Sequence, residues 1–392
     1  MPGALPETSD LVGSTRLSFI LRADPDGRLA SVLKSGNLRS NTNPMLHQTV
    51  DDNRSNRSYT RRHFLQFAGA LTVGAACPRS LLAAAAPDTP VGNPQHSTTK
   101  DADTKTSSIM QIGILLGTFA RGTLEQRLDA AKAGGLDCVQ VSLDCAGLPA
   151  MPDEIPPELA GRIRREAEAR RITIAAAQGT FNMCHPDAEH RRTGLRRLRV
   201  LAEACAPMGT AKIHLCTGTR DPDNMWRRHP DNDSPAAWSD MVACVREAAG
   251  IARQMGVVLA FEPEVNNVVD SARKARRLLD EINSPHLRVT IDPANIFHAG
   301  ELPRMREMLD EAIALLGKDI VLAHAKDLDH DGDAGHLAAG RGKLDYDRYL
   351  SLLHTSGFKG PILLHGLSEA QVPGCVAFLR EKLARLAVVS GK

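Results

Sequence analysis

The sequence predicts a single (β/α)8 TIM barrel over residues 109–390, and three observations lead to this fold. From Gln111 onward, eight short apolar runs alternate with eight amphipathic helical patterns. The apolar runs are nearly continuous, as in parallel strands whose outer face is covered by helices. Eight such units in about 280 residues match the size of this barrel. A doubly wound open sheet is the alternative, but the first run leads into GTFARGTLEQ, which lacks a GxGxxG phosphate loop.

The eight strand–helix units follow one another in chain order. The strands are expected at residues 111–116, 138–143, 172–178, 212–218, 257–264, 287–292, 320–327 and 361–366. The helices are expected at residues 124–132, 157–170, 188–206, 235–255, 271–282, 303–316, 346–355 and 369–386. Each strand is short and rich in Val, Ile, Leu or Ala, whereas each helix repeats apolar residues every three or four positions. Several helices end at glycine, which favours the left-handed conformation that terminates a helix.

The first hundred residues show no pattern that would form a core. Residues 1–56 are rich in Ser, Asn, Asp and Arg, and we expect a disordered or mis-called N-terminal extension. Residues 57–87 are typical of a twin-arginine signal peptide, since Arg61 and Arg62 precede a short apolar run and an alanine-rich stretch. Residues 88–108 indicate a linker. We therefore expect export to the periplasm, and no stable membrane anchor because the apolar run is too short to span a bilayer.

Composition excludes several classes of function. The formal net charge is only +2, from 48 basic and 46 acidic residues, so nucleic acid is not an expected partner. Aromatic residues make up 4% of the chain, which argues against a protein that binds single strands or bare sugar polymers by aromatic stacking. The eight cysteines include no CxxC pair. The oligomeric state is left open, with a homodimer as one option.

Four successive predicted strands, the fifth to the eighth, end in an ionisable side chain. These residues are Glu262, Asp292, His324 and His365. Taken singly, Asp292 before proline could be a helix cap and His365 a hydrogen-bonded core histidine. Taken together at the carboxyl ends of barrel strands, where barrel enzymes have their sites, they indicate metal ligands, because a divalent cation would offset the cost of buried charges. Two carboxylates and imidazoles favour Mn²⁺ or Zn²⁺, with Mg²⁺ and Co²⁺ as further options.

The remaining candidates lie at the same end of the barrel. Glu262, His365 and Lys326 are the expected catalytic residues, as carboxylate, imidazole and ammonium groups at strand ends. The residues expected to contact substrate at this end are Gln178, His214, Glu264 and Asn295. The long polar loop at residues 217–233 carries Trp226, and we expect it to form a lid or rim; a structural loop held by its own side chains is the alternative.

Four motifs make the resemblance to a family specific. FEPE (261–264), IDPAN (291–295), AHAKD (323–327) and AAGRGKLDY (338–346) resemble the xylose-isomerase-like TIM barrels of the sugar phosphate isomerase/epimerase type, over residues 111 to 387. The resemblance implies a metal held by Glu, Asp, His and Glu from strands five to eight. Glu262, Asp292 and His324 match the first three positions, whereas His365 stands where a glutamate is common. It also suggests that Arg341 contacts substrate oxygens.

The expected function is a metal-dependent isomerase or epimerase that acts on a sugar or cyclitol by removing the proton alpha to a carbonyl. In the family's epimerases two glutamates exchange that proton, and His365 departs from this scheme. One alternative is a metal-dependent dehydratase or lyase acting on an oxidised sugar or glycoside. Another is an exported sugar-binding barrel without catalysis. Phosphodiester hydrolysis is disfavoured by the near-neutral charge and by export.

Overall fold

The computed structural model describes residues 110–389 of the chain. The predicted extension at 1–56, the signal peptide at 57–87 and the linker at 88–108 lie outside these residues. Within the described part, no helix combines the length and apolar character needed to cross a bilayer.

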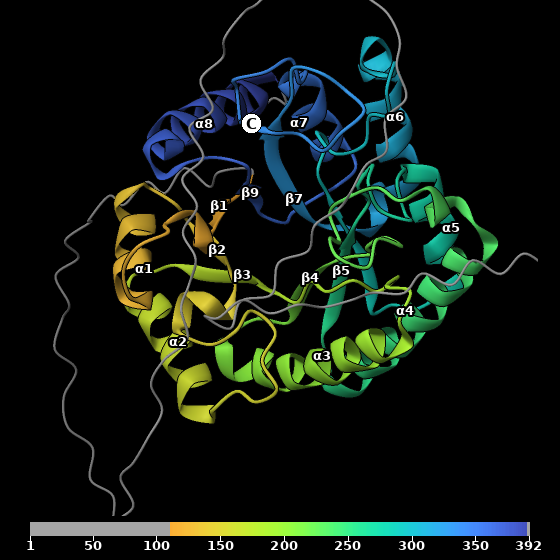
Figure 1. Ribbon diagram of the computed structural model, residues 1–392. Coiled ribbons are helices and arrows are strands. Elements are labelled where there is room, and N and C mark those ends of the chain that lie inside the picture. Colours follow the sequence, from red (N-terminus) through yellow and green to blue (C-terminus); the bar gives the residue numbers. More distant parts are fainter. Residues whose placement is uncertain (1–109, 390–392) are drawn as a thin grey trace, which may run out of the picture. The chain divides into compact units, whose positions relative to one another are not determined.

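Eight parallel strands close into a ring, which confirms the predicted single (β/α)8 barrel (Figure 1). The strands are β1 (Ile112–Leu115), β2 (Cys138–Val141), β3 (Thr173–Gln178), β4 (Lys212–Cys216), β5 (Val258–Glu262), β6 (Leu287–Ile291), β7 (Ile320–Asp327) and β9 (Ile362–Leu364). Strand β9 pairs with both β7 and β1, and β6 pairs with β7, so the ring is complete. The two-residue β8 (Leu337–Ala338) pairs antiparallel with the end of β7 and is not a barrel strand.

Helices surround the strands as an outer layer (Figure 1). They are α1 (Leu124–Ala133), α2 (Pro157–Ala169), α3 (Ala188–Met208), α4 (Pro235–Met255), α5 (Ala272–Ile282), α6 (Met305–Leu316), α7 (Tyr346–Thr355) and α8 (Val372–Val389). Helices α4 and α7 have the predicted bounds, and the other predicted bounds of helices and strands differ by at most three residues. The largest difference is at α8, where residues 369–371 form a separate 3-10 turn before the helix begins.

Side chains that accept hydrogen bonds from backbone amides determine where several helices begin. At α1, Thr123 and Gln126 form a reciprocal capping box. The Ser234 side chain accepts a hydrogen bond from a first-turn amide of α4, and the Ser271 side chain does the same at α5. Each such cap contributes about 1 kcal/mol relative to alanine. At the other end, Gly209 terminates α3 with a φ of 84°, a conformation that side chains with a Cβ rarely adopt. These caps and stops position the loops at the strand ends.

Small apolar side chains fill the interior of the barrel. The buried members of this inner cluster are Cys138, Ala175, Ala176, Ala260, Leu322 and Leu363. Because strand side chains alternate in direction, a residue two positions further along points into the same interior. Glu262, His324 and His365 follow Ala260, Leu322 and Leu363 in this way. The polar side chains therefore form a layer on top of the apolar one, at the carboxyl end of the barrel.

Candidate metal centre and active site

The structure brings together the four side chains predicted as metal ligands. Glu262 ends β5, Asp292 follows β6, His324 lies in β7 and His365 follows β9. His324 Nδ1 lies 3.4 Å from Glu262 Oε2 and 3.5 Å from Asp292 Oδ2. His365 Nδ1 lies 3.3 Å from the same Asp292 oxygen. Glu262, Asp292 and His324 are buried, while His365 is partly exposed. Two carboxylates and two imidazoles thus converge from four strands.

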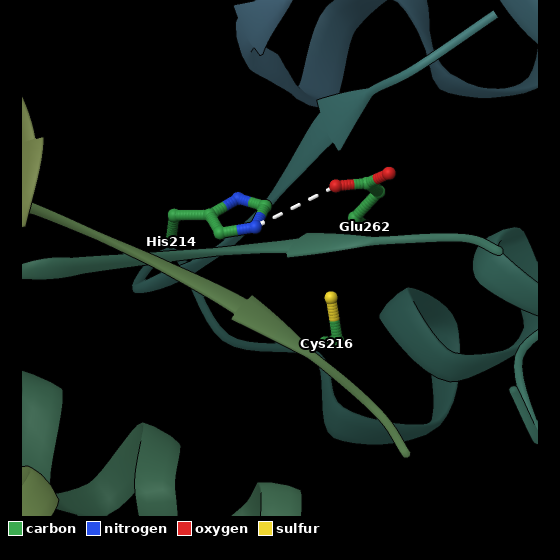
Figure 2. A group of neighbouring side chains, drawn as sticks. All are labelled: His214, Cys216 and Glu262. Carbon is green, nitrogen blue, oxygen red and sulfur yellow. Dashed lines mark ion pairs between the residues drawn. The ribbon is translucent and has the colours of Figure 1, made fainter. Parts of the chain in front are cut away.

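A fifth strand adds His214, which had been predicted only to contact substrate. Thr290 donates its hydroxyl to the carbonyl of Ala260 at 3.2 Å, so its oxygen accepts a hydrogen bond from His214 Nδ1 at 3.1 Å. Burial lowers the pKa of His214 to about 3, which keeps the ring neutral. The lone pair of this neutral ring is therefore on Nε2, 3.5 Å from Glu262 Oε2 (Figure 2). A lone pair that faces a carboxylate favours a cation between them.

The donor atoms fit a divalent cation. Neither ring nitrogen of His324 has a hydrogen-bond partner among residues 110–389, although the side chain is fully buried. Burying an imidazole without hydrogen bonds is unfavourable, and coordination of a cation by one nitrogen would remove part of that cost. Imidazole nitrogens and carboxylate oxygens are the ligands that Zn²⁺, Mn²⁺ and similar metals accept in proteins. Asp292, His324 and His365 also offer ligand atoms within 4.8 Å of one another.

Electrostatics in this layer depend on opposite charges held close together. Burial lowers the pKa of His324, but the Glu262 and Asp292 carboxylates outweigh burial and raise it to about 9. Burial raises the pKa of both carboxyl groups, yet Lys326 beside Asp292 and His324 beside Glu262 hold both pKa values below the usual range. Both carboxylates are therefore charged at neutral pH. A metal-bound nitrogen must be deprotonated, so a cation would compete with the proton on His324.

Asn295 and Lys326, both predicted site residues, form a connected network beside Glu262. The amide oxygen of Asn295 accepts hydrogen bonds from Lys326 Nζ at 3.0 Å and from the Gly335 amide at 2.9 Å. Both partners are donors, so the orientation of the Asn295 amide is determined. Its Nδ2 then donates to Glu262 Oε1. Asn295 thus holds one carboxylate oxygen of Glu262 and the Lys326 ammonium in place at once.

Glu264 is a second buried carboxyl group near Glu262, and its pKa is shifted in the opposite direction. It is 3% exposed, and its oxygens accept hydrogen bonds from the Asn266 amide at 3.1 Å and from the side chain of Asn267. Burial raises the pKa of Glu264 to about 7, and the charge of Glu262 adds to the increase. Glu262 is therefore ionised near neutral pH, while Glu264 exists in both protonation states. Such a pair can provide both an acid and a base.

A cavity of about 380 Å³ adjoins the cluster. Seven predicted site residues line it, namely Gln178, His214, Glu262, Glu264, Asn295, Lys326 and His365. Asp292 and His324 are fully buried and do not line it. Arg341 does not line it either: the residue is exposed, in the loop between β8 and α7, and its backbone amide donates to Ala338. The contact of Arg341 with substrate therefore stays a prediction.

The loop at residues 217–233 combines both roles considered from the sequence. Asp221 is buried and accepts hydrogen bonds from the amides of Asp223 and Asn224 and from the side chain of Arg227. The loop is therefore held by its own side chains. Its Trp226 also lines the cavity and is 50% exposed, so the loop forms part of the rim of the cleft.

Two residues of the site were not predicted from the sequence. Cys216 lies beside His214 and Glu262, with its sulfur toward them (Figure 2). Burial raises the pKa of this thiol well above its usual value, so it is protonated. Its position two residues after His214 on β4 was a usable signal, since both side chains point into the barrel. Thr290, which selects the tautomer of His214, gave no such signal because threonine is common in strands.

Comparisons with known proteins agree with this fold. A ketose 3-epimerase from Arthrobacter globiformis is 26% identical over 150 residues, or 37% of this chain and 47% of that protein. The match thus spans about half the length of that curated relative. The 3-keto-D-glucoside 4-epimerase of E. coli superposes with a TM-score of 0.54 at 18% identity, over 69% of this chain and 99% of that one.

A third similar protein was solved with a metal ion. The xylose isomerase-like TIM barrel protein from Mycobacterium smegmatis in complex with magnesium has a TM-score of 0.56 at 15% identity, over 71% of this chain and 97% of that one. At these identities the superpositions show a shared fold. A family model described as a xylose isomerase-like TIM barrel matches residues 128–382, from α1 to α8. The chain therefore belongs to the xylose isomerase-like TIM barrel family.

Proposed function

We propose that the protein is a metal-dependent isomerase or epimerase that removes the proton alpha to the carbonyl of a sugar or cyclitol. The observation that carries this proposal is the convergence of Glu262, Asp292, His324, His365 and His214 from five strands beside one cavity. The ketose 3-epimerase and the 3-keto-D-glucoside 4-epimerase among the similar proteins support a carbonyl sugar as substrate.

Glu262, Asp292 and His324 would hold a divalent cation, together with His214 Nε2. When bound, such a cation polarises the substrate carbonyl and stabilises the negative charge that develops on its oxygen. The magnesium complex of the Mycobacterium smegmatis protein supports a metal in this family, and Mn²⁺ or Zn²⁺ suits the donor atoms of this chain.

His365 is the residue that we assign as the proton acceptor. Its Nδ1 lies 3.3 Å from Asp292 Oδ2, and a carboxylate can only accept, so Nδ1 carries the proton and Nε2 carries the lone pair. Burial lowers the pKa of His365, which keeps the ring neutral and able to accept a proton at neutral pH. Glu262, in contrast, has one oxygen that accepts a hydrogen bond from Asn295, and its other oxygen faces His214 and His324 at 3.5 Å and 3.4 Å, where a cation would bind. The His365 imidazole would thus act in place of the second glutamate of the epimerases that this chain resembles.

Lys326 would stabilise the oxyanion of the enediolate. Asn295 engages one of the three ammonium hydrogens, which leaves donors for a substrate oxygen in the same cavity. Because the Lys326 ammonium is part of the cavity wall, its positive charge strengthens binding of a substrate that acquires negative charge in the transition state.

A metal-dependent dehydratase or lyase is the second candidate, and Glu264 favours it. Elimination starts with the same proton removal but also requires an acid that protonates a leaving oxygen. Glu264 lines the cavity, and its pKa of about 7 leaves it partly protonated at neutral pH. A protonated carboxyl at this position could therefore donate to the leaving group.

Proton exchange tests the step that both reactions share. The metal-loaded protein is incubated in D₂O with D-fructose and related keto sugars, and NMR follows loss of the C–H signals beside the carbonyl. Exchange without loss of water indicates an isomerase or epimerase, whereas release of water or an alcohol indicates a dehydratase or lyase. Sugar binding without exchange would identify a non-catalytic binding barrel and refute the proposal.

We also propose that the enzyme acts after export to the periplasm by the twin-arginine route, on the basis of Arg61 and Arg62. Export fits a free sugar or glycoside better than a phosphorylated metabolite.

A further inference from the structure

The cleft has a second lobe that the proposed proton transfer does not use. It has a volume of about 360 Å³ and is lined by residues from the carboxyl ends of β1, β2 and β3 and the loops after them, and by Met225 and Trp226 from the loop after β4. Leu115, Gln178 and Trp226 line both this lobe and the one beside the carboxylates, so the two adjoin each other. The lobe by itself is as large as a typical small-molecule pocket. A ligand confined to the first lobe would leave it filled only by water.

The walls of the second lobe combine apolar and hydrogen-bonding surface. Met151 and Met225 contribute thioether side chains, and Trp226 contributes a large ring that is 50% exposed. An exposed tryptophan ring provides a flat apolar face for a planar or ring-shaped ligand. Ser142 and Thr180 add hydroxyl groups to the same lining. A sugar ring has this dual character, with C–H groups on its faces and hydroxyls at its edge.

Gln140 contributes a hydrogen-bonding group without a partner. The residue lines the lobe at the end of β2 and is 1% exposed. Its Nε2 donates to Gln178 Oε1, and Gln178 Nε2 donates to Thr180 Oγ1 at 3.2 Å. The Oε1 of Gln140 has no hydrogen-bond partner within the described residues. This oxygen is buried, so a ligand hydroxyl would reach it only when the Gln140 side chain turns toward the lobe; because a buried acceptor left unpaired costs about 1–3 kcal/mol, that contact would gain affinity.

The charge of the second lobe excludes a phosphate. Asp144 is the ionisable residue in its lining, and no lysine or arginine lines the lobe among residues 110–389. Phosphate groups are bound by cations and by clustered backbone amides, and a carboxylate opposes them. A neutral ligand with several hydroxyl groups needs no cationic partner and is not repelled by the Asp144 carboxylate.

We propose that the second lobe binds a neutral second sugar ring, so that the substrate is a two-ring glycoside whose carbonyl-bearing ring lies beside Glu262 and His365. The assignment of the first ring rests on the proposed function; the second lobe is inferred from its own walls. The second ring packs on Trp226 and donates a hydroxyl to Gln140.

Binding measurements test this subsite. Isothermal titration calorimetry with the metal-loaded protein compares D-fructose with a panel of ketose disaccharides that carry a second hexose at different positions. We expect at least one disaccharide to bind about tenfold more tightly than D-fructose, which is the effect of one good hydrogen bond or ring contact. Met151→Trp, which fills the lobe, should remove this gain and leave the affinity for D-fructose within about threefold.

Two further variants separate the subsite from general damage. Gln140→Met replaces the amide by an apolar group of similar size and should reduce the gain in affinity of the disaccharide over D-fructose. Met308→Trp is the matched control, because Met308 is half-buried in a different surface pocket, beside α5 and α6. It should leave the gain intact.

The outcomes distinguish this inference from the proposed function. If no disaccharide binds more tightly than D-fructose, or if the gain persists in Met151→Trp, the second-ring subsite is wrong even where D-fructose exchanges its proton in D₂O. If the gain is present and Met151→Trp removes it while no sugar exchanges a proton, the subsite stands and the proposed chemistry fails.

Discussion

Replacing Asp292 by asparagine should remove most of the bound metal while leaving the barrel folded. Asp292 is fully buried, and its Oδ1 accepts a hydrogen bond from the Ala294 amide at 3.1 Å. Asparagine has the same shape and keeps that acceptor. It lacks the charged oxygen that faces His365 and His324 at 3.3 Å and 3.5 Å. The variant therefore loses one proposed anionic ligand and little packing.

The size of the effect follows from the number of ligands. Four-ligand zinc sites in small domains bind with roughly 10–16 kcal/mol, or about 3 kcal/mol for each ligand. A loss of that size weakens metal binding by about a hundredfold. Metal content after dialysis, measured by inductively coupled plasma mass spectrometry, should fall from near one ion per chain to a small fraction, and calorimetry should give the change in Kd.

Asp327→Asn is the matched control. Asp327 is also a buried aspartate and lies at the end of β7. Its carboxylate oxygens accept hydrogen bonds from the backbone amides of Leu328, Gly340 and Leu344, and the residue does not line the cavity. This variant should lose stability and keep its metal. A Kd for Asp292→Asn within about threefold of the wild type would refute the assignment of Asp292 as a ligand, as would equal metal loss in both variants.

Three further predictions concern the base, an ion-pair cluster and export. His365→Gln should lower proton exchange by about a hundredfold or more while metal binding changes less, because general bases contribute about 10²–10⁴; unchanged exchange would exclude His365 as the base. Asp270 pairs with Lys274 at 2.8 Å, and although burial raises its pKa, His298 and Lys274 lower it to about 2 from a usual 3.8. Its contribution of about 2 kcal/mol is present above pH 4 and lost as pH falls toward 2, so Asp270→Asn should lower Tm at pH 7 but not near pH 2; equal Tm values at pH 7 would contradict this. Changing Arg61 and Arg62 to lysine should retain the precursor in the cytoplasm, and mature periplasmic protein in normal amounts would argue against the twin-arginine route.

Local patterns in the sequence were sufficient to predict the barrel and the meeting of the four candidate ligand side chains at its carboxyl end. Apolar runs separated by amphipathic helices fix a parallel sheet with helices on one face, and the closed ring follows from eight repeats. Glu262, Asp292, His324 and His365 could be grouped because all parallel strands deliver their carboxyl ends to one rim. That grouping needs only the end of each strand, which apolar periodicity locates within two residues.

Contacts between side chains on different strands and loops could not be predicted from the sequence. The tautomer of His214 depends on Thr290, which is 76 positions away and meets it only across the barrel. The amide of Asn295 is oriented by Lys326 and a loop amide, and the partnerless oxygen of Gln140 depends on how its amide meets Gln178. Arg341 belongs to the family motif, yet its loop places it away from the cavity. Each of these features depends on register and side-chain rotamers in three dimensions, which no local pattern encodes.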